Sequence, residues 1–308
     1  MNLRDLYMDW RRNKEPFVKA STISAYTLLC ENHILNAYGN RSELTEYDLQ
    51  SFVLNKINDG LSRKTVKDIM IVLKMIIKYG VRYNLWKEMP PFEHVQWPSQ
   101  NYVAPIEVLN FQDYKKLVKY TEDNFTFRNL GILLSLSAGL RIGEVCALKF
   151  SDFDLHEKTV TISRTIQRVY TFDYKTDTRK TELIIDNPKT ANSNRTIPLS
   201  AFLVKVLKAL DKIVNQDHFV LTNDLTPTEP RTYRSYYKNL MKKLNMPSVK
   251  YHGLRHSFAT QCIAAGVDVK TVSVLMGHAN VSITFDLYVH PTGEQKSLAI
   301  NKLFKSMK

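Results

Sequence analysis

The sequence lacks the features of membrane-spanning and secreted proteins. Its longest nearly apolar run, at 130–140, falls short of the ~20 residues that a membrane-spanning helix requires. The N-terminus carries acidic residues and no continuous apolar core, so we do not expect a signal peptide there. The three cysteines, Cys30, Cys146 and Cys262, are widely separated, without metal-ligand spacing or a disulfide pattern. We therefore expect buried thiols in a reducing, cytoplasmic compartment.

Internal repeats, low-complexity tracts and a glycine-rich phosphate loop are also missing from the sequence. Without that loop and without alternating strand–helix units, a nucleotide-binding enzyme is disfavoured. Positive charge, by contrast, is abundant: 43 Lys and Arg oppose 30 Asp and Glu, which gives a net charge of +13. This excess favours a polyanionic partner, with nucleic acid ahead of an anionic membrane surface.

A linker divides the 308 residues into two segments, because 89–107 contains four prolines and little periodicity. The segment before the linker is helical in pattern. Its clearest helix is predicted to begin after Ser62 and to end at Gly80. Opposite the apolar face of this helix lies a basic stripe, which is either a solvated surface or a contact for DNA phosphates. The stripe consists of Arg63, Lys67, Lys74 and Lys78.

The segment after the linker is predicted to be mixed α+β, with a small antiparallel sheet against a helical body. Residues 108–148 are helix-rich, and 159–171, 181–186 and 195–199 are rich in strand-forming residues. NPKTANSN joins the last two and is predicted to turn a hairpin. Helical periodicity then continues to the C-terminus. The whole chain is therefore expected to be mainly α with a small antiparallel sheet.

The stretch YHGLRHSFAT places His252, Arg255 and His256 within about one helical turn. Three potential cations so close together repel one another, which indicates an anionic ligand brought from outside. The two histidines have the i, i+4 spacing of a zinc pair. However, the metalloprotease pattern needs Glu where Gly253 stands, and Arg255 would repel a dication. We therefore predict no metal site and expect His256 to pack internally.

A second cluster lies in SAGLRIGEVCAL at 137–148. Gly139 is predicted to end an apolar helix, and Arg141 to start a new one with Glu144 one turn later. An arginine at a helix start is well placed to bind an anionic oxygen, and Glu144 would orient it. The alternative is an ordinary i, i+3 ion pair on the surface.

A third cluster lies in LMGHANVSITFDLYVH. Asp268 is predicted to cap a helix that ends at Gly277, which places His278 in the following turn. Ser282 is predicted to cap the next helix, which carries Tyr288. Taken alone, Tyr288 reads as an ordinary surface tyrosine, and only its position relative to the other two clusters singles it out.

In order and spacing, these motifs resemble those of the tyrosine recombinases, or phage-type integrases. The resemblance covers the whole segment after the linker, and HxxR followed by GH and then Tyr is a specific combination. The matching residues are Arg141 in GLRIGE, Lys189 in NPKTANSNRTIPL, His252 and Arg255 in HGLRH, His278 in MGH, and Tyr288. The first segment resembles the family's core-binding domain by pattern, through TISAYTLLCENHIL, LTEYDLQSF and GLSRKTVKDIMIVLKMIIKYGV.

The resemblance implies a helical core-type DNA-binding domain at 1–97, a linker at 98–106, and a catalytic domain at 107–308 with a C-terminal tail helix. The two domains would clamp a DNA duplex. The tail helix would dock either on its own domain or on a neighbouring subunit. A separate arm-type DNA-binding domain, found in many phage integrases, is not expected before residue 1.

The resemblance also implies the chemistry. Tyr288 would attack the scissile phosphate and form a 3′-phosphotyrosyl intermediate, which conserves the bond energy for rejoining. Lys189 would protonate the departing 5′ oxygen as general acid, and His252 would assist proton transfer at Tyr288 or bind a phosphate oxygen.

The remaining residues would stabilise the phosphorane-like transition state. Arg141 and Arg255 would clamp its non-bridging oxygens, and His278 would donate another hydrogen bond. Glu144 would hold the constellation in place. No cofactor and no metal ion are expected, because the arginines supply the positive charge.

The expected partners are double-stranded DNA with paired inverted half-sites, further copies of the chain in a tetramer that forms Holliday junctions, and possibly a directionality factor. GLSRKTVKDI and RTIQRVYTFDYKTDTRKTEL favour a mobile-element integrase. A chromosome-dimer resolvase of the Xer type and a catalytically inactive DNA-binding regulator are the alternatives. The expected location is the bacterial cytoplasm, at the nucleoid.

Overall fold

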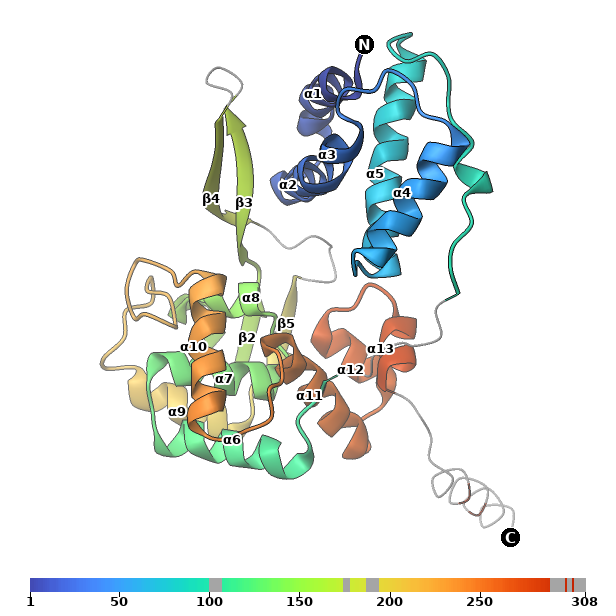
Figure 1. Ribbon diagram of the computed structural model, residues 1–308. Coiled ribbons are helices and arrows are strands. Elements are labelled where there is room, and N and C mark those ends of the chain that lie inside the picture. The colour runs from blue at the N-terminus through green and yellow to red at the C-terminus, as the bar shows by residue number, and fades with distance from the viewer. Residues whose placement is uncertain (100–106, 174–177, 187–193, 289–296, 298–300, 302–308) are drawn as a thin grey trace. The chain divides into compact units, whose positions relative to one another are not determined.

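The computed structural model describes residues 1–99, 107–173, 178–186 and 194–288, together with 297 and 301. The chain divides into two compact units (Figure 1). The first unit comprises 1–104 with 168–182, and the second comprises 105–167 with 183–308.

Five α-helices build the N-terminal part of the first unit (Figure 1). They are α1 (Leu3–Lys14), α2 (Ala20–Leu29), α3 (Leu35–Tyr38), α4 (Glu46–Asn58) and α5 (Arg63–Arg82). One turn of π-helix, Cys30–Ile34, joins α2 to α3. The buried stripe of α5 and the apolar face of α1 form the centre of this unit's core. The amphipathic helix predicted here is confirmed, because all five of its apolar positions are buried, namely Ile69, Val72, Leu73, Ile76 and Ile77.

The predicted end of that helix at Gly80 is wrong, because α5 continues to Arg82. The start at Ser62 is confirmed, since its side chain accepts a hydrogen bond from the Thr65 amide. Gly80 has a packing role instead. A Cβ there would lie 2.7 Å from Leu6 and 2.8 Å from Trp86, so only glycine lets these side chains approach α5 so closely.

The second unit is a helical body with a small sheet. Its helices are α6 (Phe111–Asp123), α7 (Phe127–Ala138), α8 (Ile142–Ala147), α9 (Ala201–Leu210), α10 (Pro230–Lys243), α11 (Tyr251–Ala264), α12 (Val269–Met276) and α13 (Val281–Tyr288). Helices α7 and α11 lie against each other in the core. Buried hydroxyls fix their contact, with the Ser135 Oγ 2.7 Å from the Tyr251 hydroxyl. The α+β class is confirmed.

The pairing of the strands differs from the prediction. Strands β1 (Phe153–Asp154), β2 (Thr159–Ile162) and β5 (Arg195–Pro198) form an antiparallel sheet in the order β1-β2-β5. Strands β3 (Thr165–Asp173) and β4 (Thr178–Asp186) form a separate two-stranded sheet. The hairpin predicted around NPKTANSN is therefore wrong, because the strands on its two sides belong to different sheets.

The predicted strand-rich stretch 159–171 is likewise two strands, β2 and β3. Arg164 lies between the two strands, and its Nη2 lies 2.6 Å from both carboxylate oxygens of Asp152. This ion pair anchors the segment that connects β2 to β3. Among the described residues, no helix is long and apolar enough to cross a membrane.

Candidate active site

The first part of the site is the turn between α7 and α8. Gly139 ends α7 in the left-handed conformation, with φ +63°, and Arg141 is the residue that precedes α8. Both the backbone N of Arg141 and its Nη1 donate hydrogen bonds of 2.8 Å to the Glu144 carboxylate. The Glu144 side chain is only 3% exposed, whereas that of Arg141 is 36% exposed. The pair is therefore not an ordinary surface ion pair, because its carboxylate lies beneath the surface.

The second part is the C-terminal end of α12, where three consecutive backbone carbonyls each accept a hydrogen bond from a different arginine. The Leu275 carbonyl binds Arg195 Nε at 2.8 Å, the Met276 carbonyl binds Arg255 Nη2, and the Gly277 carbonyl binds Arg141 Nη2 at 3.3 Å. Positive side chains are stabilised at a helix C-terminus, where the carbonyl groups point outward. These bonds bring together residues from the turn before α8, from β5 and from α11, beside the turn that carries His278.

The third part is the first turn of α11. His252 is exposed, whereas Arg255 is only 1% exposed and donates from Nη1 to the Gly139 carbonyl at 2.6 Å. Arg255 therefore connects the turn before α8 to the end of α12. Its contact with a phosphate stays a prediction. The rings of His252 and His256 meet edge to face, with centroids 4.6 Å apart.

The electrostatics of this turn resolve the repulsion that the sequence suggests. Loss of hydration lowers the pKa of His252, and the nearby Arg255 and Arg141 lower it further. Burial, His252 and Arg255 lower the pKa of His256 to about 4. Both rings are therefore neutral near pH 7, and the positive charge of the cluster comes from its arginines.

His278 lies in the turn between α12 and α13, as predicted. Asp268 caps α12, and Gly277 ends it with φ +63°. Burial lowers the pKa of His278 to about 4, with further contributions from the neighbouring arginines and His256. Its Nδ1 lies 2.7 Å from the hydroxyl of Thr284, which is fully buried on α13. This contact fixes the orientation of the ring.

Two predicted site residues, Lys189 and Tyr288, have no described side chain. Lys189 lies outside the described residues, as does the tail after 288 apart from 297 and 301. For Tyr288 the backbone is described, at the last position of α13. The predicted cap of α13 at Ser282 is wrong. The helix begins at Val281, and the Asn280 side chain accepts a hydrogen bond from the Ser282 amide.

Arg195 is a site residue that the sequence analysis missed. Its Nη1 and Nη2 donate to the two oxygens of Glu144 at 3.1 and 3.0 Å, and the Arg195 side chain is only 6% exposed. A signal for it was present, because strand alternation in RTIPL places Arg195 on the same face as the apolar Ile197. An arginine on the buried face of a strand needs an anionic partner.

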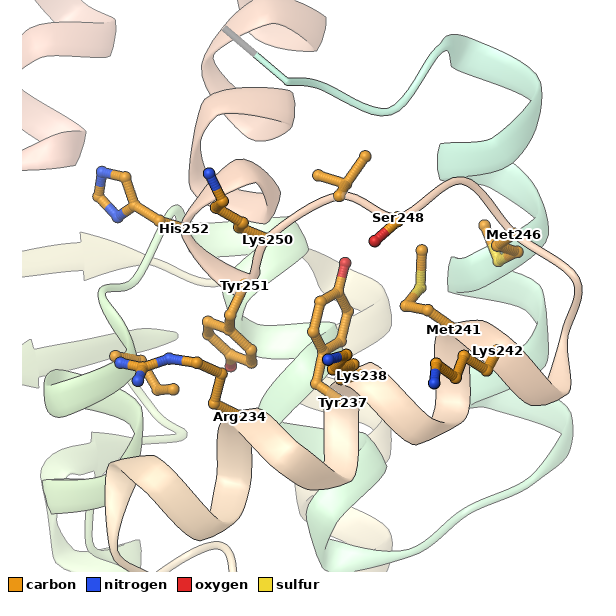
Figure 2. Close-up of a pocket in the computed structure, with 12 residues that line it drawn as sticks. Arg234, Tyr237, Lys238, Met241, Lys242, Met246, Ser248, Lys250, Tyr251 and His252 are labelled. Atoms are coloured by element: carbon orange, nitrogen blue, oxygen red, sulfur yellow. The ribbon is translucent and has the colours of Figure 1, made fainter. Parts of the chain in front are cut away.

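A basic pocket of about 490 Å³ borders His252 (Figure 2). Tyr237, Met241 and Tyr251 are buried at its wall, and exposed cations surround them. These cations are Arg234, Lys238 and Lys242, which follow one face of α10, and Lys250 just before α11. This surface is not evident from the sequence, because its charges become a cluster only when α10 and α11 are placed together.

The predicted basic stripe lies on α5 in the first unit. Lys67, Lys74 and Lys78 are exposed, and Arg63 is partly buried. Aromatic rings from the segment after α5 hold three of these cations. Trp97 lies 5.9 Å from Arg63 and 5.5 Å from Lys67, and Phe92 lies 5.5 Å from Lys74. Such contacts stabilise and orient cationic side chains.

Comparison with known proteins matches residues 107–295 to the Phage integrase family. A tyrosine recombinase XerC-like protein of Caldanaerobacter subterraneus subsp. tengcongensis is 29% identical, over 98% of this chain and 83% of its own length. The transposase from transposon Tn916 of Enterococcus faecalis is 24% identical, over 99% of this chain and 78% of its own length.

Solved structures share the fold. The integrase of transposon Tn1549, in complex with transposon right end DNA, superposes with a TM-score of 0.78 at 21% identity, covering 98% of this chain and 99% of that one. A lambda integrase tetramer bound to a Holliday junction superposes with a TM-score of 0.65 at 16% identity, covering 94% of this chain and 78% of that one.

Proposed function

Because the chain belongs to the phage integrase family, we propose that it is a tyrosine-type site-specific DNA recombinase, the integrase of a mobile element. It would cleave and rejoin DNA strands through a 3′-phosphotyrosyl intermediate and a Holliday junction. The observation that carries this proposal is that Arg141 and Arg255 both bind carbonyls at the C-terminal end of α12, directly before the turn that carries His278. Three separate elements supply these residues, and a shared anionic substrate gives them one purpose.

In the proposed reaction, Tyr288 attacks the scissile phosphorus and the bond to the 5′ oxygen breaks. Lys189 donates a proton to that leaving oxygen, and His252, neutral and exposed, accepts the phenolic proton or binds a phosphate oxygen. The reverse attack by a deoxyribose hydroxyl on the phosphotyrosine rejoins the strand at little net cost. No external energy source is needed, because one phosphoester replaces another.

The transition state gathers negative charge on the non-bridging oxygens, and the arginines would offset it. Arg141 is the most exposed of the three arginines, which places it to meet the phosphate first. His278 would donate from Nε2 if the Thr284 hydroxyl donates to Nδ1, since a neutral ring carries a single proton. Through its hydrogen bond to Nη1, Glu144 would hold the guanidinium group of Arg141 in one orientation.

Two basic surfaces support the proposal that each unit holds DNA. The cations beside the pocket on α10 flank His252, so they would contact phosphates next to the scissile one. The α5 stripe would contact the duplex through the core-type domain, for which we retain the limits 1–97, with the linker at 98–106 and the catalytic domain at 107–308.

The proposed partners are paired inverted half-sites, three further copies of the chain in a tetramer, and a directionality factor. The lambda integrase tetramer on a Holliday junction supports the tetramer by analogy of fold. Both a XerC-like recombinase and the Tn916 transposase are relatives, so a resolvase is the second candidate. The structural likeness to the Tn1549 integrase favours the mobile-element role, with action at the nucleoid.

The decisive experiment traps the covalent intermediate. The wild-type chain first selects its binding sequence from a randomised duplex library, and nicked versions of that sequence then serve as suicide substrates. We expect wild type to form a covalent protein–DNA adduct. We expect Tyr288→Phe to bind the duplex equally well and form none.

The matched control is Tyr47→Phe, which removes the hydroxyl of a tyrosine that is 79% exposed in the first unit. This control is expected to form the adduct at the wild-type rate. An adduct from Tyr288→Phe would refute the assignment of the nucleophile, and no adduct from wild type would favour the inactive regulator.

A further inference from the structure

Arg195 connects two parts of the site without reaching its surface. Nη1 and Nη2 bind both oxygens of Glu144, and Nε binds the Leu275 carbonyl on α12. Such a two-point pairing with a carboxylate fixes both distance and plane, which a single donor cannot do. The position of Arg195 at the first residue of β5, paired with Ile162 of β2, anchors the guanidinium to the sheet.

One carboxylate therefore lies between two guanidinium groups that differ in exposure. Arg141 on the outer side is 36% exposed, whereas Arg195 on the inner side is 6% exposed. A buried carboxylate is stable only when its charge is compensated and its oxygens accept hydrogen bonds. Arg195 supplies both, so Glu144 can bind Arg141 while Arg141 keeps an exposed portion toward solvent.

We propose that Arg195 is a positioning residue for strand cleavage, which aligns Arg141 through Glu144 and His278 through the end of α12. This inference rests on the proposed function and deepens it. Arg195 itself does not touch the phosphate. Arg195 sets the distance between Arg141 and His278, because its guanidinium binds both Glu144, which holds Arg141, and the end of α12, which precedes His278.

The charges around Glu144 make this role measurable by pH. Arg195 and Arg141 contact its carboxylate. Other charged or titratable groups among the described residues near this network are Arg255, His252, His256 and His278. Burial raises the pKa of Glu144, but the hydrogen bonds and charge of Arg195, followed by those of Arg141, lower it below the ordinary value. Without Arg195, the pKa of Glu144 would rise, because Arg141 alone would then oppose the effect of burial, and Glu144 would take up a proton at a higher pH.

The experiment measures single-turnover adduct formation on the nicked duplex, DNA affinity and thermal unfolding for Arg195→Met and Arg195→Lys. We expect Arg195→Met to bind DNA as wild type does and to form the adduct about 10²-fold more slowly, since small misplacements of catalytic groups cost that much. Arg195→Lys keeps the positive charge but loses the two-nitrogen pairing with Glu144, so its rate should lie between those of Arg195→Met and wild type.

The pH profile separates positioning from a merely structural role. In Arg195→Met the rate should fall on acidification at pH values where wild type is flat, because Glu144 becomes protonated. Adding Glu144→Gln to Arg195→Met should remove this pH dependence. If Arg195→Met does not fold, the pH profile of adduct formation by Arg195→Lys is used in its place to test the inference.

Arg164→Met is the matched control, since it breaks another arginine–carboxylate pair in the same unit, in which the single nitrogen Nη2 contacts both oxygens of Asp152. It should lose stability but cleave at the wild-type rate. Wild-type cleavage by folded Arg195→Met, or equal slowing in Arg164→Met with no change in pH profile, would overturn the inference alone. No adduct from wild type would overturn the proposed function together with it.

Discussion

Replacing Gly139 by alanine tests how the turn between α7 and α8 holds the site. Two effects combine at this residue. With φ at +63°, an alanine would occupy the left-handed region, at a cost of about 1–2 kcal/mol. Its Cβ would also lie 2.6 Å from Cδ1 and 2.9 Å from Cε1 of Phe258, which is buried on α11. Overpacking of this kind costs about 1–3 kcal/mol, so we expect Gly139→Ala to lose about 2–5 kcal/mol in free energy of unfolding.

Gly266→Ala is the matched control, because Gly266 has φ +86° and nothing within 4 Å of an added Cβ. It should lose only the conformational part, about 1–2 kcal/mol. The entropy that alanine removes from the unfolded chain is the same in both variants and cancels in the difference. The remaining gap of about 1–3 kcal/mol reports the contact with Phe258.

The assay is urea denaturation followed by circular dichroism and, separately, by tryptophan fluorescence. All three tryptophans, Trp10, Trp86 and Trp97, lie in the first unit, whereas Gly139 lies in the second. The unfolding midpoint followed by fluorescence should therefore be the same in Gly139→Ala as in wild type. Phe258→Leu in the Gly139→Ala background should recover part of the loss by a double-mutant cycle. Equal losses in Gly139→Ala and Gly266→Ala would refute the argument.

Two further predictions concern protons and salt. The DNA-free protein should lose stability as the pH falls from 6.5 towards 4, since burial lowers the pKa of His256 from 6.5 to about 4 and the unfolded chain binds the proton first. In thermal melts, the stability of His256→Gln should depend less steeply on pH over this range than that of wild type. An equally steep pH dependence in both would contradict this prediction. Lys67→Ala with Lys74→Ala should weaken DNA binding and reduce the slope of log K against log salt by about 1.8, measured by fluorescence anisotropy. The control is Lys119→Ala, which removes a lysine of the second unit that pairs with Asp123 on the same helix. An equal change of slope in Lys119→Ala would refute the DNA contact of α5.

Features that depend on neighbouring residues were predictable from the sequence. The caps at Ser62 and Asp268 and the helix ends at Gly139 and Gly277 follow from side-chain and φ preferences within one turn, and the structure confirms them. The predicted helix end at Gly80 is wrong because the role of this glycine depends on a residue far away in the chain. A glycine inside a helix looks like a stop signal until the contact with Leu6, far away in the chain, is known.

Strand pairing shows the same limit. The segments at 181–186 and 195–199 are close in sequence and are predicted to pair, yet β5 pairs with β2 and β4 with β3. Pairing depends on which segments meet in space, and local residue preferences are the same for either partner. The role of Arg195 was hidden for this reason, since only the β2–β5 pairing turns it towards Glu144.

By itself, the sequence determined the residue types of the site, their order along the chain and the helices that carry them, because these are local properties. Only the tertiary structure decided that Glu144 is buried between two arginines and that three arginines bind consecutive carbonyls at the end of α12. It also decided that the histidines beside them are neutral near pH 7, since a pKa depends on burial and on charges brought close by folding.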